Sequence, residues 1–271
     1  MSDLPYRFLD LHVVRTERVG PALMRVTLTG DRLGDVVTGG RDQRFKLFLP
    51  QPGQDAPLLP DLGEGWYAQW RAQDPAVRPV MRTYTVRELR REPDELDVDF
   101  VQHGTGDHSG PASTWAREAA PGDRVTVLAP VVEDNGGVDF QPPAGTDWVL
   151  LTADESALPA VAGILAWLPA GIPAKVWIEV AHPEDVEDLP TDADAEITWL
   201  VGNSGSVLDA IRAADLPPGT PYAWIAGESG TVRGVRRHLV SERGIDRRAV
   251  TFTGYWRRGA TEEDLLAELT A

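Results

Sequence analysis

Residues 81–87 read MRTYTVR, a run in which cationic, aromatic and hydroxyl side chains alternate. The β-branched and apolar positions from Val80 onward predict a short strand. Successive side chains of a strand point to opposite faces, so Arg82 and Tyr84 share one face while Thr83 and Thr85 share the other. This combination suits a planar ligand that carries phosphate. The same pattern also fits an ordinary surface strand.

The residues on both sides of this segment carry further strand signals separated by turns. Apolar or alternating runs occur at residues 11–14, 23–28, 44–49, 96–101 and 124–128. Six or so short strands with one helical insert predict an antiparallel β-barrel. The proline- and glycine-rich segment 51–79 is expected to form a long loop inside it, a class of segment that is usually functional or mobile.

The pattern changes near residue 143. Strands are predicted at residues 148–151, 174–180, 196–200, 222–226 and 250–253, and helices at 156–168, 207–214 and 230–243. Alternation of apolar strands with helices predicts a parallel sheet with crossover helices, an α/β domain of the nucleotide-binding type. We therefore expect two domains, residues 1–143 and residues 144–271.

Composition narrows the class of protein. The chain has 271 residues, of which 42% are hydrophobic and 25% charged, so it is long enough for two globular domains. It contains no cysteine, which excludes disulfides, thiolate metal sites, iron–sulfur clusters and a thiol nucleophile. Any redox chemistry must therefore come from a bound cofactor.

Charge and hydropathy disfavour several partners. The net charge is −16 and the pI is about 4.7, which argues against nucleic acid and anionic membrane surfaces. The N-terminus lacks an apolar signal region and no apolar run is long enough to span a membrane. We expect a soluble, cytoplasmic protein.

Small residues precede a predicted helix near Ala112. Gly110, Pro111, Ala112 and Ser113 leave backbone N–H groups exposed in the first helical turn, where the helix dipole also favours an anion. This segment predicts a pyrophosphate cradle. An ordinary capped helix is the alternative interpretation.

A second turn follows the first predicted parallel strand. Residues 154–159 contain no glycine and so cannot be a Gly-x-Gly-x-x-Gly fingerprint. They nonetheless join a strand end, a helix start and the carboxylates of Asp154 and Glu155, the place where doubly wound sheets bind ligands. An acidic first turn of an ordinary helix is the alternative.

The strand at residues 82–85 and the turn at 110–113 together resemble the flavin-binding half of the ferredoxin-NADP reductase superfamily. Three further motifs resemble one branch of that superfamily, the siderophore-interacting proteins, also called ferric-siderophore reductases. They are ADESALPA at residues 153–160, AGE at 226–228 and GYWRRG at 254–259. Ser156 stands where the family often has Thr, a change that retains the hydroxyl.

The resemblance implies an FAD-binding barrel followed by an NAD(P)H-binding α/β domain. The residues implied for FAD are Arg82, Thr83, Tyr84, Thr85, Asp99, Val101, His103, Gly110, Pro111, Ala112 and Ser113. Those implied for the nicotinamide nucleotide are Asp154, Glu155, Ser156, Ala157, Gly227 and Glu228. A C-terminal aromatic, Trp256 or Tyr255, is expected to cover the flavin ring, with a place in the core as the alternative for Trp256. His103 has the alternative of a simple loop residue.

The function that this resemblance implies is ferric-siderophore reduction, with electrons passing from NADH or NADPH through FAD to Fe(III). The cofactor carries the chemistry, so no protein residue is expected to act as a catalytic acid or base, and no resident metal is expected. Ferric siderophores are commonly anionic, so a local cationic pocket is required. Our candidates for it are Lys46 with Arg247 or Arg257.

Two alternatives stay open. One is a flavodoxin or ferredoxin reductase of the same architecture, and the other is a siderophore-binding flavoprotein that does not turn over. A ferredoxin is an alternative electron donor, and we expect a monomer.

The region after the second parallel strand predicts a preference for NADH. Glu179 ends that strand, residues 182–188 are mainly acidic, and no Arg or Lys occurs before Arg212. A carboxylate accepts a hydrogen bond from a ribose 2'-hydroxyl but repels a 2'-phosphate. The arginines at positions 233, 236 and 237 are the alternative phosphate-binding group.

Overall fold

The computed structural model describes residues 4–102, 110–202 and 204–260. The chain divides into two compact units, one of residues 1–19 and 23–138 and the other of residues 20–22 and 139–271. This break lies a few residues before the predicted domain boundary at 143, and that boundary stays a prediction. No helix among the described residues is long and apolar enough to cross a membrane.

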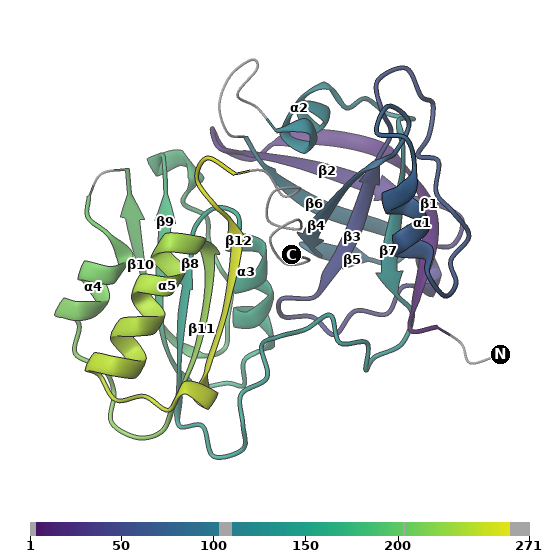
Figure 1. The fold of residues 1–271 in the computed structure, drawn as a ribbon. Helices are drawn as coiled ribbons and strands as arrows, with labels where there is room; N and C mark the ends of the chain where they lie inside the picture. Colours follow the sequence, from purple (N-terminus) through teal and green to yellow (C-terminus); the bar gives the residue numbers. More distant parts are fainter. Residues whose placement is uncertain (1–3, 103–109, 203, 261–271) are drawn as a thin grey trace. The chain divides into compact units, whose positions relative to one another are not determined.

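The first unit is a seven-stranded antiparallel sheet (Figure 1). Its strands lie in the order β4-β3-β7-β1-β2-β6-β5. They are β1 (Tyr6–Arg18), β2 (Leu23–Thr29), β3 (Arg44–Leu49), β4 (Val80–Thr85), β5 (Glu88–Arg90), β6 (Glu95–Val101) and β7 (Arg124–Pro130). The predicted antiparallel class of this unit is confirmed.

The core of this sheet follows from side-chain alternation. Leu9, Leu11 and Val13 of β1 point inward with Val125 and Val127 of β7, and all five are buried. Helix α2 (Pro111–Glu118) adds Ala112 and Ala116 to the same core. A short 3-10 turn, η1 (Leu33–Asp35), adds Leu33.

Two elements of this unit differ from prediction. Strand β1 extends well beyond residues 11–14 because a bulge between Val13 and Arg15 lets it continue along β2. Strand β5 is too short, and too charged at its ends, to give a strand signal.

The segment 51–79, predicted to be a loop, contains a helix, α1 (Trp66–Ala72). Trp66 packs edge-to-face on Phe8 of β1, with ring centroids 5.3 Å apart, and on Phe48 of β3, 6.1 Å apart. Trp70 packs on the same Phe48 and donates from Nε1 to the Pro79 carbonyl, 3.1 Å away. These tertiary contacts stabilise a helix that the local Pro and Gly content did not predict.

The second unit is a five-stranded parallel sheet in the order β10-β9-β8-β11-β12. Its strands are β8 (Trp148–Ala153), β9 (Pro173–Val180), β10 (Asp194–Val201), β11 (Pro221–Glu228) and β12 (Val250–Trp256). Its helices are α3 (Leu158–Trp167), α4 (Val207–Ala213) and α5 (Ser229–Arg237). The short turns are η3 (Pro183–Asp185), the π-helical η4 (His238–Glu242) and η5 (Arg247–Ala249). The predicted α/β class is confirmed.

Helices cover both faces of this sheet (Figure 1). Ile211 of α4 and Val235 of α5 belong to one buried cluster with Leu150 of β8 and Ile225 of β11. Helix α3 lies outside that cluster and contacts β8. Strand β8 lies between β9 and β11, so the chain reverses its winding direction after β10. The carboxyl end of β8 is therefore the topological switch point of the sheet.

Candidate functional site

Strand β4 carries the predicted flavin motif next to β3. Thr83 lies opposite Lys46 in the strand register, and Lys46 Nζ donates to Thr83 Oγ1 over 2.7 Å. Arg82 is half-buried and donates to the carbonyl of the neighbouring Met81, 2.8 Å away. The structure thus places Lys46, predicted for the substrate, directly beside the predicted flavin strand.

Tyr84 of β4 faces the barrel core rather than open solvent. Its ring centroid lies 4.5 Å from that of Phe100, which in turn packs on Trp115 of α2 at 5.7 Å. Thr85 is buried at the end of the strand. These tilted ring contacts hold the position of Tyr84 on the sheet.

Asp99 and Val101 lie on the neighbouring strand β6. The carboxylate of Asp99 is buried and accepts from Arg25 Nε at 2.7 Å and Arg25 Nη2 at 2.9 Å, while Arg87 lies 3.6 Å away. Asp99 therefore holds two cations of the barrel in place. Val101 is half-buried at the strand end, and His103 lies outside the described residues.

The first turn of α2 begins at Gly110 without a side-chain cap, and Pro111 occupies its first position. Ala112 and Ser113 are buried in that turn. Ser113 Oγ lies 3.5 Å from Gln102 Oε1, and the buried Nε2 of Gln102 has no hydrogen-bond partner among the described residues. Uncapped backbone N–H groups beside an unsatisfied buried donor fit an oxygen-rich group such as a pyrophosphate. No local sequence pattern pointed to Gln102.

Asp154 is the centre of the switch point in the second unit. Its Oδ1 accepts from Ser156 N at 2.9 Å and Ser156 Oγ at 2.5 Å. Its Oδ2 accepts from Glu228 N at 2.8 Å and from Trp256 Nε1 at 2.7 Å. The predicted residues at 154–156, 227–228 and 256 are therefore brought together at the ends of β8, β11 and β12.

Gly227 is required for this approach. Its φ is +130°, and a Cβ at this position would lie 2.7 Å from Asp154 Oδ2. The register of β11 and β12 shifts between Gly227 and Glu228, which turns the Glu228 N–H toward the carboxylate. Ala157 is fully buried beneath the turn.

Three further carboxylates at this edge bind backbone N–H groups. Glu155 accepts from Ala181 N at 2.5 Å, Glu179 accepts from Val207 N at 2.9 Å, and Glu228 accepts from Gly230 N at 2.6 Å. Glu179 and Glu228 thus occupy the N-terminal turns of α4 and α5, whereas α3 starts without a side-chain cap.

Burial and backbone N–H groups shift the pKa values of these carboxyl groups in opposite directions. It raises the pKa of Glu155, and the charges of Asp154 and Asp185 add to the rise, although backbone N–H groups oppose it. Burial likewise raises the pKa of Glu179. It also acts to raise the pKa of Glu228, but the N–H groups of Thr231, Arg258 and Gly230 outweigh it and the pKa is lowered.

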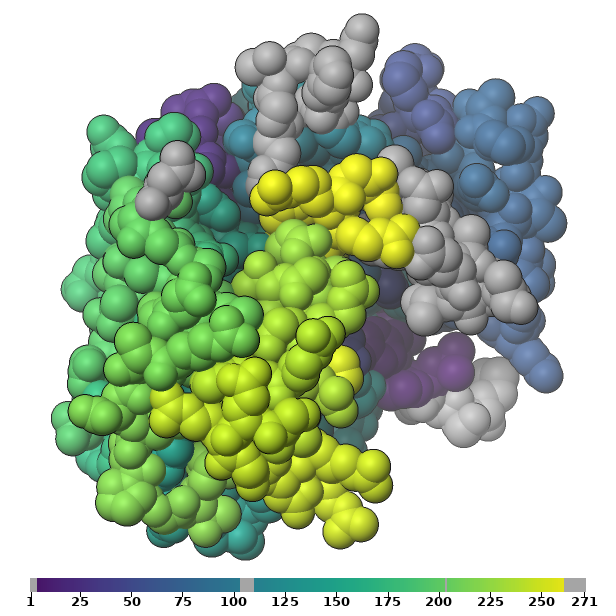
Figure 2. Space-filling model, turned by 60° about the vertical axis from the view of Figure 1, so that its left-hand side comes forward, coloured from purple at the N-terminus to yellow at the C-terminus, as the bar shows by residue number. Residues whose placement is uncertain are grey.

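The candidate residues of the C-terminal region lie at different positions along β12. Tyr255 packs edge-to-face on Trp224 at 6.4 Å, and Ser229 Oγ donates to the Trp256 carbonyl at 2.9 Å. Arg257 directly follows β12 at the carboxyl end of the sheet, beside Trp256. Arg247 precedes β12 and lies roughly 20 Å away along the strand. The segments before and after β12 reach the surface at opposite ends of α5 (Figure 2). The position therefore favours Arg257 over Arg247.

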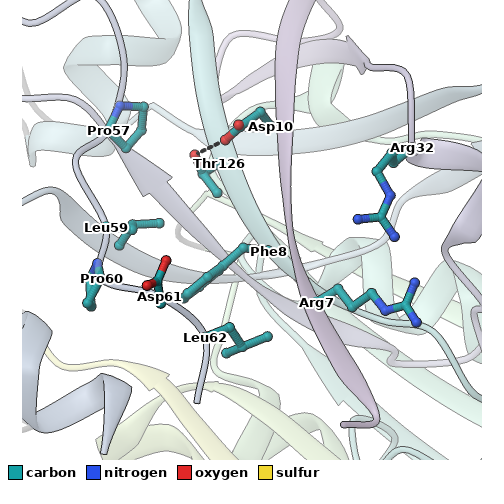
Figure 3. A pocket seen from close by; sticks show the side chains of 10 residues that line it. All are labelled: Arg7, Phe8, Asp10, Arg32, Pro57, Leu59, Pro60, Asp61, Leu62 and Thr126. Atoms are coloured by element: carbon teal, nitrogen blue, oxygen red, sulfur yellow. Dashed lines mark hydrogen bonds between the residues drawn. The ribbon is translucent and has the colours of Figure 1, made fainter. Parts of the chain in front are cut away.

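A separate open cavity of about 440 Å³ lies in the first unit (Figure 3). It is lined by Phe8, Asp10 and Thr126 of the sheet, by residues 57 and 59–62, and by Arg7 and Arg32. Arg7 and Arg32 both pair with Asp35, and Thr126 donates to Asp10 over 2.8 Å. None of the residues predicted for a ligand lines this cavity.

Comparison with known proteins agrees with the resemblance seen in the sequence. Residues 12–134 match the model of the siderophore-interacting FAD-binding domain, and residues 146–259 match that of siderophore-interacting protein. The chain is 34% identical to the ferric vibriobactin reductase ViuB of Vibrio cholerae, over 95% of this chain and 91% of that protein.

Two more relatives span nearly the whole chain. The NADPH-dependent ferric-chelate reductase of Escherichia coli is 31% identical over 92% of this chain and 93% of that protein. The crystal structure of the siderophore-interacting protein SipS from Aeromonas hydrophila superimposes with a TM-score of 0.77 at 34% identity, covering 97% of this chain and 96% of that one.

Replacing Gly227 tests the close approach of β11 to Asp154. Gly227→Ala should lower the free energy of unfolding through both its positive φ and the clash with Asp154. Gly205→Ala is the matched control, because Gly205 has φ +139° with open space around it. We expect the Gly227 variant to lose at least about 1 kcal/mol more in denaturant unfolding. Equal losses would show that the contact is not tight.

Proposed function

This chain belongs to the siderophore-interacting protein family, and we propose that it is a flavin-dependent ferric-siderophore reductase. Electrons would pass from NAD(P)H through FAD to the Fe(III) of a siderophore. The proposal rests on one feature of each unit. In the first unit, α2 contacts β4 and starts without a side-chain cap. In the second unit, Asp154 joins the carboxyl ends of β8, β11 and β12. We also propose that the protein acts as a monomer in the cytoplasm.

In the first unit, Arg82 and the N–H groups of the α2 turn would hold the phosphates of FAD, and Tyr84, Thr83 and Thr85 its ring. The buried Nε2 of Gln102 supports this assignment, because a phosphate oxygen would satisfy it. Asp99 would act indirectly, by holding Arg25 and Arg87. When bound, FAD supplies a two-electron acceptor that can release electrons singly.

In the second unit, the nicotinamide nucleotide would lie beside the carboxyl end of β8. Glu155, Ser156 and Ala157 would line one side of the site, and Gly227 and Glu228 the other. The turn from Asp154 to Ala157 lies at the topological switch point, where doubly wound sheets bind ligands, and this supports the placement. We assign to Trp256, rather than Tyr255, the part that the family resemblance gives to the C-terminal aromatic.

Iron is the substrate of this reaction and stays in its own chelator. A hard oxygen cage that suits Fe(III) suits Fe(II) less well, so reduction loosens the metal. Lys46 is our candidate in the first unit for attracting an anionic ferric complex to a protein whose net charge is −16. Arg257 is the separate candidate in the second unit.

Stopped-flow spectroscopy tests this function and separates it from its alternatives. Flavin reduction by NADH or NADPH, followed by reoxidation with a ferric siderophore, is expected for the reductase. Reoxidation only by ferredoxin or flavodoxin would indicate the related reductases. Negligible flavin turnover with either nucleotide would indicate a binding protein, unless a reduced ferredoxin replaces the nucleotide as donor.

Arg82→Ala tests the phosphate contact. The variant loses a charge-assisted hydrogen bond, so FAD affinity should fall by about 1.5–3 kcal/mol, roughly ten- to a hundredfold. Isothermal titration of the apoprotein with FAD measures it. Arg32→Ala removes an arginine of the same unit that pairs with Asp35 and should bind FAD normally. Unchanged affinity in the Arg82 variant would remove Arg82 from the site.

Lys46→Glu tests the attraction of the ferric complex. The KM for an anionic ferric siderophore should rise, because the local charge that attracts the substrate is reversed. Lys46 also donates to Thr83 Oγ1 of the proposed flavin strand, so FAD affinity and flavin reduction by NADH are measured in the same variant. The sequence has two lysines, so Lys175→Glu gives the same change in net charge on β9 and is the matched control. If both variants keep the original KM, Lys46 has no part in substrate binding.

A preference for NADH is expected from the acidic end of β9. Glu179 is fixed there by Val207 N, and the described residues between 180 and 212 include no lysine or arginine to bind a 2'-phosphate. The ratio of kcat/KM values should favour NADH at least tenfold, about 1.4 kcal/mol. A clear advantage for NADPH, for which the Escherichia coli relative is named, would instead point to arginines 233, 236 and 237.

A further inference from the structure

The Asp154 carboxylate is only 8% exposed and has two hydrogen-bond donors on each oxygen. Two of the donors belong to Ser156 in its own turn. The third is the backbone N–H of Glu228, 74 residues away, and the fourth is the indole N–H of Trp256, 102 residues away. The acceptor capacity of this side chain is therefore used within the protein, and a ligand would find little of it left.

An ionised carboxylate is required by this arrangement of donors. Asparagine has one acceptor oxygen and an NH₂ group that only donates. If that oxygen stayed with Ser156, the NH₂ group would face the N–H groups of Glu228 and Trp256, and two donor pairs would oppose each other. No cation pairs with Asp154 among the described residues, so backbone N–H groups, the Ser156 hydroxyl and the Trp256 indole hold its charge.

Trp256 is fixed by two hydrogen bonds, one from its side chain and one to its backbone. Its indole donates to Asp154, and its carbonyl accepts from Ser229 Oγ at the start of α5. The next turn follows the same edge, since Arg258 N lies 3.4 Å from Glu228 Oε1. The side chain of Asp154 thus fixes both the β11–α5 turn and the last residue of β12, on the side of β8 where the nucleotide is proposed to bind.

We propose that Asp154 is a positioning residue for the nicotinamide nucleotide that acts through Trp256 and the Glu228 backbone instead of touching the ligand. This inference rests on the proposed function of the second unit. It predicts that neutralising Asp154 releases the indole and weakens nucleotide binding.

The test follows the Trp256 indole resonance in ¹H–¹⁵N spectra of the FAD-loaded protein, assigned by its loss in Trp256→Phe. Asp154→Asn should shift this resonance upfield and speed its exchange with solvent, with the other indole resonances in place as evidence of folding. Titration with NAD⁺ and, separately, NADP⁺ should give a dissociation constant about tenfold weaker than in the original protein.

Asp147→Asn is the matched control. Asp147 accepts from Thr220 N at 2.6 Å and so joins the amino ends of β8 and β11, whereas Asp154 lies at their carboxyl ends. It should leave the Trp256 resonance and the nucleotide affinity as they are. Trp256→Phe keeps the other three bonds of Asp154, and in that background Asp154→Asn should cost less affinity than it does alone.

The outcomes separate the inference from the function. Failure of the original protein to bind or oxidise either nucleotide would contradict the proposed function. Normal nucleotide binding by the original protein with an unchanged Trp256 resonance or unchanged affinity in Asp154→Asn would overturn the inference alone. Full additivity of the two substitutions would overturn the route through Trp256. A general loss of indole dispersion in Asp154→Asn would mean that the carboxylate holds the fold and not the site.

Discussion

The need of buried carboxylates for hydrogen-bond donors is the constraint on which both units depend. A buried ionised group without partners costs several kcal/mol, so each one fixes the elements that supply its donors. In the barrel the donors are mainly guanidinium groups. Arg25 and Arg87 hold Asp99, and Arg90 with Thr27 holds Asp97. In the parallel sheet they are backbone N–H groups, one hydroxyl and one indole, which gather at Asp154.

These two solutions leave different electrostatic surroundings for a ligand. Ion pairs neutralise the barrel carboxylates, so Lys46 and Arg82 can act on an anion without nearby opposition from them. At the carboxyl edge of the sheet the negative charge is retained, and Glu179 and Glu228 also occupy the N-terminal turns of α4 and α5. The helix ends that would otherwise favour phosphate are therefore used by the protein itself.

Much of the fold could be predicted from the sequence because its signals are local. The apolar runs of the parallel sheet and the alternation in β2, β3 and β6 each specify a strand without reference to distant residues. Helix α1 could not be predicted this way, since its stability comes from Phe8 and Phe48. The motifs around residues 82, 110 and 154 located the candidate sites. The bonds from Asp154 to Trp256 and the unsatisfied Gln102 Nε2 depend on tertiary placement, and no spacing rule reports them.

The anchored helix α1 also decides how the long segment 51–79 responds to proteases. Its composition is that of an exposed tether, the usual place for nicking. Yet Gln51 and Gln54 donate to the carbonyls of Arg78 and Val77, Gln73 donates to that of Leu58, and Trp66 lies against two rings of the sheet. Cleavage requires local unfolding, and here that would break the clamps at both ends of the segment together with the aromatic contacts. We therefore expect this segment to resist digestion better than its length and proline content suggest.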